Sequence, residues 1–522
     1  MSEKITSLFD GLNRRQVLKT GMVAGATALM PGFIGRAKAK TPGLVVFGLS
    51  SYPPGFKPWE NKGTASTTVK VQQYRGLLGY GADGQPRAEL AASWKVLAGD
   101  KFQFNLRKNA YFHNGEKVTS KDVKATYEAM AAKDSTARLR SRMAAIKMIE
   151  TPDDNTVIIT LNAPDVTFID IAASPHCGIV SGKALAADPK NFVGAGPYKI
   201  VNIERGSRIE LEAFDKYYKA GFPKTKKLRF DAFKDENLRV AALEAGDVDI
   251  IEYLPWQAMD SVGKNNRLKM DVVNGPFMYV VFNFSKGPFQ NPKLRQAVGY
   301  AIKREDVIAA AFYGRGNVLG GIPLQESSPF YDTKYQNRWS YDPDKAKSLM
   351  KEAGHANGFS ATLLSTAQYG MHKNTAEVVQ QNLAAIGINV KLNLPDWAKR
   401  VSIGNQGQYD FAVMGSAGDF NDPDALTKFM DGSLAASYAR SYGFKDARIS
   451  ELFAKGRQEA NFEKRKVLYA ELQQRALDLA PVIPINWRAQ GYGYQSYLSG
   501  FTNIPGFLTF FSGMVIENIE IG

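Results

Sequence analysis

Apolar and polar side chains alternate most regularly just after residue 100. Residues 102–106, Phe-Gln-Phe-Asn-Leu, place an apolar side chain at every second position, which predicts a strand with one buried face. Asn114-Gly115 then favours a tight turn. Thr119 and Asp122 have the spacing of a capping box, so a helix is predicted to begin there. Apolar residues recur along it at helical spacing, at Val123, Tyr127 and Met130. A strand, a turn and a capped helix in this order form a scaffold rather than a reaction centre.

Helical and strand-like patterns alternate along the rest of the chain. Asn291-Pro292 and Asp342-Pro343 are typical helix starts, because the first residue caps the helix and proline fits its first turn. Together with apolar periodicity, such signals predict helices at residues 238–245, 291–311, 341–354 and 375–387. Apolar runs predict strands at residues 44–49, 247–251, 278–284 and 388–392. This alternation predicts an α/β fold.

Residues 1–39 have the features of an export signal. Asn13-Arg14-Arg15-Gln16-Val17-Leu18-Lys19 resembles a twin-arginine motif, and 16 uncharged residues separate it from Arg36. Ala37-Lys38-Ala39 supplies the small residues that a signal peptidase needs. The uncharged run contains Gly and Pro and is shorter than the ~20 apolar residues that span a bilayer. We therefore expect export by the twin-arginine route to the periplasm of a Gram-negative cell, as a soluble protein.

Composition narrows the possible classes of protein. Removal of residues 1–39 would leave 483 residues, more than one hydrophobic core usually serves, so two or more lobes are expected. The removed segment carries six basic and two acidic residues, so the formal net charge falls from +15 to +11. No block of five basic residues occurs, and the densest run, residues 224–227, falls in a predicted loop. A solvated basic surface is expected rather than a nucleic-acid site.

Few residues are suited to a catalytic or metal centre. Cys177 is the only cysteine, so no intrachain disulfide can form. Its neighbour His176 would point to the opposite face of an extended segment, which argues against a catalytic pair. The other histidines are scattered, at His113, His355 and His372. Metal-binding HExxH and CxxC motifs, a nucleophile elbow and a phosphate loop are all missing from the sequence. We expect no enzyme activity, no metal and no cofactor.

Four segments resemble, in the same order, the dipeptide/oligopeptide-type solute-binding proteins of bacterial ABC importers. They are the strand, turn and helix of residues 102–123, Gly-Ala-Gly-Pro-Tyr-Lys at 194–199, the helix and strand at 238–251, and Arg-Gln-Ala-x-x-x-Ala-Ile-x-Arg at 295–304. The resemblance covers essentially the whole chain after the signal. It implies the two-lobed periplasmic-binding-protein fold of the large type II class, with an extra inserted domain and a hinge that closes the lobes around a ligand.

The resemblance also implies a division of the chain. Residues 1–39 would be the signal peptide, 40–80 the first part of domain I, 81–182 the inserted domain II, 183–286 the second part of domain I, 287–485 domain III, which is the second lobe, and 486–522 the C-terminal part of domain I.

One motif implied by the resemblance points to a ligand contact. Gly418-Asp419 matches the family's Gly-Asp segment, in which the aspartate pairs with the α-ammonium group of a bound peptide, a charge-assisted hydrogen bond. On local sequence alone an Asx turn explains Asp419 equally well. Dipeptide binders commonly have an aromatic residue where this chain has Ser416, which would enlarge or polarise the pocket and argues against a strict dipeptide preference.

Further ligand contacts are expected from aromatic residues and from one histidine. Trp397 stands where the family has a tryptophan near the cleft, and Tyr52 lies in an early loop that would face it, although packing in the core explains Tyr52 better. No arginine can be assigned to a ligand carboxylate. The corresponding region offers His372 and Lys373, and a lysine would bind an acid with less geometric precision.

The expected function is that of a periplasmic binding component of an ABC importer. It would capture a short peptide, an opine or a related amino-acid derivative, deliver it to the permease transmembrane subunits, and act as a monomer. A carrier of a metal chelate or haem is the alternative within the same fold, to which His372 and Met371 would contribute. A periplasmic hydrolase is the remaining alternative, but the sequence contains no hydrolase motif that would support it.

Overall fold

The computed structural model describes residues 42–60 and 62–522, so the predicted signal peptide lies outside the described residues. Residues Gly43–Gly522 form one compact unit. Its centre is an 11-stranded mixed sheet. In spatial order the strands are β15 (Ile388–Asn393), β14 (Phe359–Leu364), β16 (Phe411–Ser416), β12 (Leu268–Phe282), β17 (Val482–Gln495), β11 (Ile250–Ile251), β1 (Leu44–Leu49), β10 (Lys227–Ala232), β9 (Arg208–Ala213) and β8 (Tyr198–Glu204), with β13 (Gly316–Val318) paired to β17.

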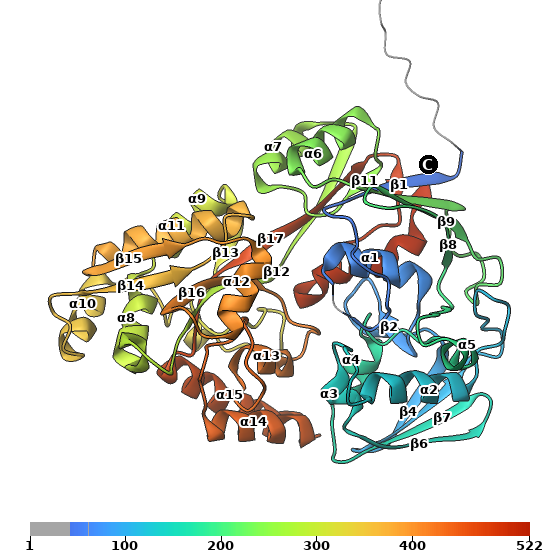
Figure 1. Cartoon of the computed structure of the whole chain (residues 1–522), viewed down its shortest axis with the longest axis horizontal. Helices are drawn as coiled ribbons and strands as arrows, with labels where there is room; N and C mark the ends of the chain where they lie inside the picture. The colour runs from blue at the N-terminus through green and yellow to red at the C-terminus, as the bar shows by residue number, and fades with distance from the viewer. Residues whose placement is uncertain (1–41, 61) are drawn as a thin grey trace, which may run out of the picture. The chain divides into compact units, whose positions relative to one another are not determined.

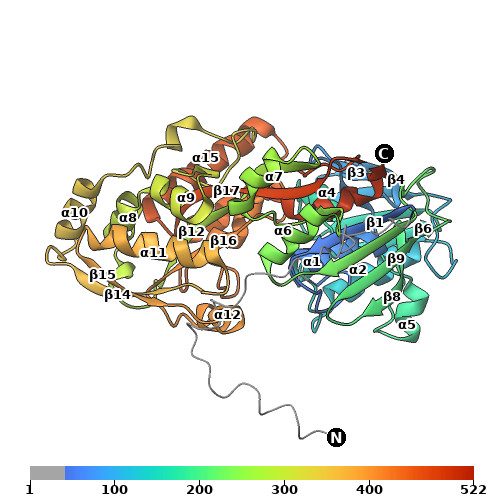
Figure 2. The same cartoon turned by 90° about the horizontal axis from the view of Figure 1, so that it is seen from above.

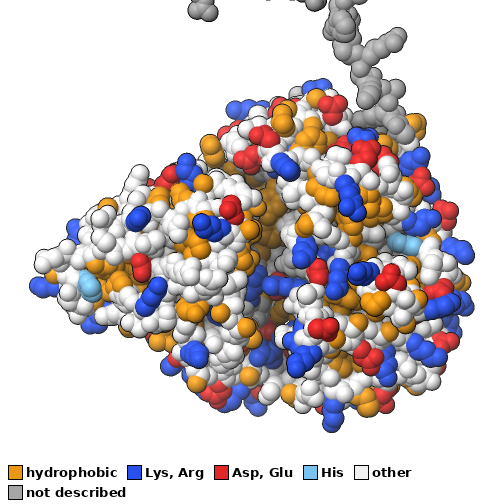
Figure 3. Space-filling model, viewed as in Figure 1, with side chains coloured by type: hydrophobic (Ala, Val, Ile, Leu, Met, Phe, Trp, Pro, Cys, Tyr) orange, Lys and Arg blue, Asp and Glu red, His pale blue; other side chains and the backbone are white. Residues whose placement is uncertain are grey.

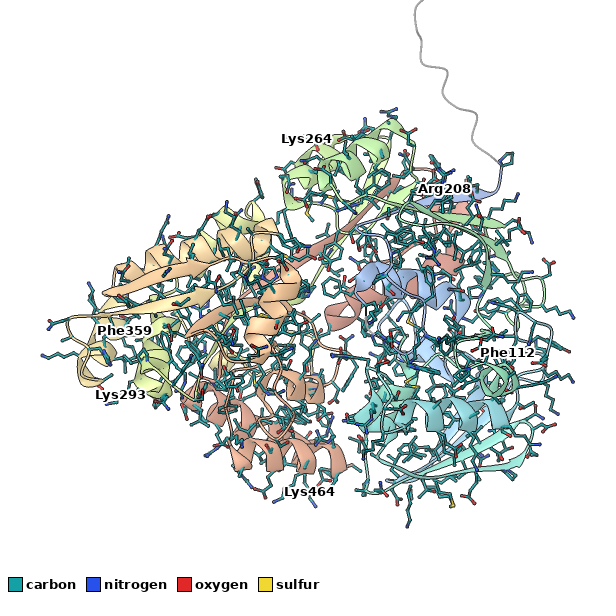
Figure 4. All side chains as sticks on the ribbon, in the orientation of Figure 1. Phe112, Arg208, Lys264, Lys293, Phe359 and Lys464 are labelled. Atoms are coloured by element: carbon teal, nitrogen blue, oxygen red, sulfur yellow. The ribbon has the colours of Figure 1, made fainter. Side chains whose placement is uncertain are left out.

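Two lobes share this sheet and are joined by its two longest strands (Figures 1 and 2). The first lobe comprises residues 42–267 and 496–522 apart from residue 61, and the second comprises residues 283–481. The first half of β12, residues 268–274, pairs with the part of β17 that also pairs with β11. The second half of β12, from residue 277 on, pairs with β17 on one side and with β16 on the other. The register shifts between Asn274 and Phe277, where the strands pass from one lobe to the other. Figure 4 shows Phe112 among the side chains of the first lobe and Phe359 among those of the second.

The first lobe contains a separate four-stranded antiparallel sheet, seen below the main sheet in Figure 1. Its strands are β4 (Ala91–Ala98), β5 (Lys101–Leu106), β7 (Thr156–Leu161) and β6 (Ile146–Asp153). Helix α2 (Ser120–Ala131) packs on this sheet and against α3 (Arg140–Met143) and α5 (Gly182–Ala187). The strand, turn and capped helix predicted from residues 102–123 are confirmed, since Thr119 and Asp122 form the capping box of α2.

The other elements of the first lobe surround its half of the large sheet. They are α1 (Thr64–Gln73), β2 (Leu78–Tyr80), β3 (Pro86–Ala88), α4 (Phe168–Ala173), α6 (Glu236–Ala245), η1 (Trp256–Ala258), α7 (Met259–Lys264), β18 (Leu498–Ser499), η5 (Gly506–Asn518) and β19 (Glu520–Ile521). Helix α1 packs against the 3-10 segment η5. None of the helices in the described part of the chain has the length and apolar content that a membrane crossing requires.

The second lobe carries most of the remaining helices. They are η2 (Pro288–Gln290), α8 (Pro292–Ala301), α9 (Arg304–Phe312), η3 (Thr333–Tyr335), α10 (Pro343–Glu352), α11 (Gly370–Ala384), α12 (Trp397–Asn405), η4 (Pro423–Leu426), α13 (Thr427–Met430), α14 (Ala447–Gln458) and α15 (Phe462–Leu479). The single helix predicted at 291–311 is wrong, because α8 and α9 are separate. Ile302 and Lys303 are extended between them, with ψ of 114° and 99°, and the Lys303 N–H donates to Asn382 at 2.9 Å.

The predicted α/β fold is confirmed, whereas the detailed domain boundaries stay a prediction. The predicted boundary at 485/486 falls inside β17, and that at 286/287 falls shortly after the end of β12. Both predicted boundaries are therefore close to the crossing strands.

Gly275 lies at the register shift of β12, where the backbone of the first lobe approaches it closely. A Cβ atom at this position would stand 1.9 Å from the carbonyl oxygen of Gly506, at the start of η5. Because that atom belongs to the backbone, the contact is relieved only if η5 shifts away from β12.

We predict that Gly275→Ala lowers the free energy of unfolding by about 2 kcal/mol, the usual cost of overpacking. Chemical denaturation followed by circular dichroism measures it. Gly55→Ala is the matched control, since a Cβ atom there meets nothing within 4 Å. Equal stability of the two variants would contradict the assigned contact.

Candidate functional site

Arg488 is a buried cation at the junction of the two lobes. It lies on β17, one residue from the register shift, and only 2% of its surface is exposed. One N–H donates to the sulfur of Met371 in the second lobe at 2.8 Å, and the guanidinium lies 5.7 Å from the ring of Phe510 in the first. Its Nε has no hydrogen-bond partner in the part of the chain that the structure describes. Among the described residues no carboxylate lies within 4.0 Å of it, and burial lowers the pKa of Arg488 to about 10.

Arg400 on α12 is a second buried guanidinium that lacks a carboxylate partner among the described residues. It is fully buried and lies between the rings of Trp397 and Tyr438, at 5.4 and 5.5 Å. It donates to the carbonyl oxygen of Val413 at 3.0 Å and to the sulfur of Met414, while Nε and Nη1 have no partner. Burial lowers the pKa of Arg400 to about 10. In the part of the chain that the structure describes, no carboxylate forms an ion pair with it.

His372 is affected by the charges of both arginines, Arg400 and Arg488, which we call the arginine pair. Its buried ring lies 5.7 Å from the ring of Trp397 and 6.1 Å from that of Tyr369. Burial, and then the charges of Arg400 and Arg488, hold the pKa of His372 well below its usual range, so the imidazole is neutral. Its Nδ1 has no partner. In the described part of the chain, neither guanidinium of the arginine pair has a carboxylate within 4.0 Å, so their two positive charges favour an anion.

Aromatic residues of the first lobe cover the same region from the other side. Tyr253 and Phe510 are stacked with their ring centroids 5.5 Å apart, and Phe510 is the ring that Arg488 approaches. Figure 3 shows a hollow between the lobes, with hydrophobic side chains in its depth and lysine and arginine side chains along its lower part. Such a surface can bind a small solute through apolar contact and a few charged groups.

Asp419 lies just after β16 and is bound by an arginine of the first lobe. The Nη2 atom of Arg138 donates to both carboxylate oxygens, at 2.8 and 3.1 Å, and Nζ of Lys428 stands 4.0 Å away. Burial alone would raise the pKa of Asp419, but the charges of Arg138 and Lys428 outweigh it and hold the pKa at about 2. The prediction that Asp419 receives a ligand ammonium stays a prediction, and its partner in this structure is a guanidinium of the protein.

A second ionic contact joins the lobes beside the first. Arg142 of α3 donates to Asp424 of the second lobe at 3.0 Å and to Asp165 of its own lobe at 2.6 Å. Asp424 also accepts from Arg457 of α14 at 2.7 Å. The backbone N–H of Val166 donates to the carbonyl oxygen of Arg457 at 2.8 Å. At this place the lobes are therefore joined by two ion pairs, Arg138–Asp419 and Arg142–Asp424, and by a backbone hydrogen bond.

The structure brings some of the predicted site residues together. Trp397 and His372 are ring neighbours beside Arg400, and Gly418 adjoins Asp419. A Cβ atom on Gly418 would stand 2.4 Å from the ring of Phe507, so glycine permits close packing there. Ser416 ends β16 opposite Phe277.

Two other candidate ligand contacts, Tyr52 and Lys373, have contacts within the protein that account for their positions. Tyr52 lies in the loop after β1, half-buried against the core. Lys373, on the exposed side of α11, is 3.7 Å from Glu377 and so has an intrachain partner. In the described part of the chain no three His, Cys, Asp or Glu side chains gather in a way that could hold a metal ion.

Sequence reasoning missed Arg488, Arg400 and Arg138. The signal that could have found Arg488 is a lone arginine within the apolar β17 segment Val-Ile-Pro-Ile-Asn-Trp-Arg, where a strand is otherwise buried. Arg138 carries no such signal, because its partner Asp419 lies 281 residues away in the sequence.

Comparison with known proteins identifies the family to which the chain belongs. Residues 85–437 match the model of the bacterial extracellular solute-binding proteins, family 5. The glutathione-binding protein GsiB of Pectobacterium atrosepticum is 32% identical over 353 residues, covering 66% of this chain and 68% of GsiB. GsiB of Escherichia coli K12 is 27% identical over 507 residues, covering 94% and 97%.

Solved structures of the same architecture cover nearly all of the described residues. The binding protein AgaA from A. tumefaciens R10, in complex with agropinic acid, is 41% identical with a TM-score of 0.85, covering 92% of this chain and 99% of AgaA. DppA from Helicobacter pylori, in complex with the peptide STSA, is 22% identical with a TM-score of 0.80, covering 92% and 98%. The protein described here therefore belongs to family 5 of the bacterial extracellular solute-binding proteins.

Proposed function

We propose that this protein is the periplasmic substrate-binding component of an ABC importer for a small acidic solute derived from an amino acid, such as an opine or a short peptide. It would enclose the solute between its lobes and release it unaltered to the transmembrane subunits of the permease. Membership of the solute-binding family and the two-lobed fold support this role. The single observation that carries the choice of an acidic solute is the buried guanidinium of Arg488, which has no carboxylate partner among the described residues.

The arginine pair has the chemistry to hold a carboxylate. A guanidinium presents a planar fork of N–H donors that matches the two oxygens of a carboxylate, and the bond is strongest where water is excluded. Nε of Arg488 and Nε and Nη1 of Arg400 are donors without a partner. Unmatched buried charges of this kind destabilise a folded protein, so their presence is explained if a ligand supplies the anion.

The remaining predicted contacts are proposed to shape the rest of the binding site. Trp397 and Tyr52 would supply flat apolar surface, and His372 would act as a neutral hydrogen-bonding group beside the arginine pair. Ser416 would leave room near Asp419 for a substituent larger than a dipeptide side chain, and Gly418 would allow Phe507 to pack closely beside that aspartate. AgaA and GsiB, whose names connect them with agropinic acid and glutathione, show that relatives bind modified amino acids and peptides.

Capture is proposed to occur by hinge closure at the crossing strands. The register shift between Asn274 and Phe277 interrupts regular pairing at the junction of the lobes, which is where a hinge would absorb changes of backbone angle. Export by the twin-arginine route would place the protein in the periplasm, where the permease subunits are accessible.

We predict that Arg488→Gln abolishes the rise in melting temperature that a bound solute causes, while the ligand-free protein keeps or gains stability. Removing an uncompensated buried charge relieves its desolvation cost, and removing the guanidinium leaves the solute's acid group without its partner. Differential scanning fluorimetry with glutathione, agropinic acid, mannopinic acid and acidic dipeptides measures both effects.

Lys373→Gln is the matched control for this variant, because Lys373 adjoins His372 but pairs with Glu377 on the exposed side of α11. Its melting temperature should respond to the solutes as the unmodified protein does. A full response in Arg488→Gln, or conversion of a solute into a product by the unmodified protein, would contradict the proposed function.

We predict a weaker contact between the lobes in acid, caused by Asp419. Its pKa is lowered from 3.8 to about 2 in the folded protein, so its contribution is fully present above about pH 4 and is lost as the pH falls through 2. This shift corresponds to about 2 kcal/mol. Denaturation from pH 5 to pH 2 should show the stability difference between the unmodified protein and Asp419→Asn shrinking over that range.

Asp134→Asn is the control for the acid titration, since Asp134 is exposed in the loop that precedes Arg138. Its stability should remain parallel to that of the unmodified protein from pH 5 to pH 2. A stability difference for Asp419→Asn that stays constant over this range would show that Asp419 is not held by Arg138 and Lys428.

A further inference from the structure

Positive charges outnumber negative charges around Asp419. The group of Asp419, Arg138 and Lys428, which we call the Asp419 cluster, contains one carboxylate and two cations. Lys428 lies on α13, where it donates to the carbonyl oxygen of Ala417 at 3.0 Å and stands 5.1 Å from the ring of Phe429. The three charged side chains keep 21%, 28% and 24% of their surface exposed for Asp419, Arg138 and Lys428 respectively, so a solute can reach them.

The carboxylate of this cluster, Asp419, is already hydrogen-bonded to a cationic side chain of the protein. Both oxygens of Asp419 accept a hydrogen bond from Arg138. Arg138 is anchored in the first lobe, because its backbone N–H donates to the carbonyl oxygen of Trp59 at 2.8 Å. A ligand ammonium would have to displace this guanidinium, and it would then add a third cation beside Arg138 and Lys428. Like charges at such distances repel, and removal from water strengthens the repulsion.

The arginine pair extends the same imbalance to the junction of the lobes. Arg400 and Arg488 have no carboxylate partner among the described residues, and His372, which the charges of both arginines affect, is neutral. The Asp419 cluster and the arginine pair together hold four cationic side chains and one carboxylate, and that carboxylate is already bound by Arg138. A solute with a net negative charge and no cationic group would best balance the charge of these two groups.

We propose that Arg138 occupies the place of a ligand ammonium on Asp419, so that the protein selects acids whose nitrogen is uncharged, as in an amide or lactam, over acids that carry a free ammonium. This deepens the proposed function, on which it rests, by naming the solute class. Asp419 then forms an ion pair between the two lobes and does not bind the ligand, and Arg488 binds the acid group of the ligand.

The test uses matched pairs of acids that differ in the charge of one nitrogen. The pairs are N-acetyl-Ala-Glu with Ala-Glu, N-acetylglutamate with glutamate, and agropinic acid with mannopinic acid. In the third pair, agropinic acid is the lactam and mannopinic acid is the corresponding ring-opened amino diacid. Isothermal titration should give at least tenfold tighter binding of the uncharged-nitrogen member in every pair that binds. Arg138→Gln frees the carboxylate of Asp419, so this variant should bind the ammonium member tighter than the unmodified protein does and reverse the order.

Arg142→Gln is the matched control, because it removes the neighbouring ion pair with Asp424 and leaves Asp419 bound to Arg138. It should weaken both members of a pair alike and leave their ratio within twofold. Tighter binding of the ammonium member to the unmodified protein would overturn the proposal, as would an unchanged ratio in Arg138→Gln.

The two proposals fail in different ways. Tighter binding of the ammonium-bearing member, lost in Arg488→Gln, overturns the selectivity and leaves the proposed function intact. Binding that is indifferent to Arg488→Gln overturns the proposed function. If no probe of either kind binds, the assignment of an acidic solute is overturned together with the selectivity.

Discussion

The pairing of β12 with β17 is the constraint on which the rest of the structure depends. These two strands run through both lobes, and their register shift marks the junction. The same pairing carries Arg488 to that junction, with Met371 of the second lobe on one side and Phe510 of the first on the other. A charged residue at the junction of two lobes can couple the binding of a solute there to the way the lobes meet.

Electrostatics explains why such a protein would close on a solute. The arginine pair holds two buried positive charges without a carboxylate partner among the described residues, which is unfavourable until an acid binds. The Arg138–Asp419 and Arg142–Asp424 ion pairs join the two lobes through the protein's own residues. The Arg138–Asp419 pair is partly exposed and therefore weak, whereas Asp424 is buried and is paired with both Arg142 and Arg457.

The sequence predicted those parts of the fold that depend on local chemistry. The strand, turn and capped helix of residues 102–123 were predictable because alternation, an Asn-Gly turn and a capping box act over a few residues. The break between α8 and α9 was not predictable, since it involves a hydrogen bond from Lys303 to Asn382, far along the chain. The candidate site divides in the same way. The motif singled out Gly418-Asp419, whose role in ligand binding stays a prediction. The surroundings of Arg138, Arg400 and Arg488 depend on residues that only folding brings near them, so the sequence did not indicate these arginines.

The most direct test of the central claim is a crystal structure of the protein with its natural solute bound, obtained by purifying the complex from the cells that produce the protein. The account predicts an acid group of the solute within hydrogen-bond distance of the Arg488 guanidinium, while Asp419 remains bound to Arg138. A solute enclosed elsewhere, or one whose ammonium group lies on Asp419 with Arg138 displaced, would contradict it.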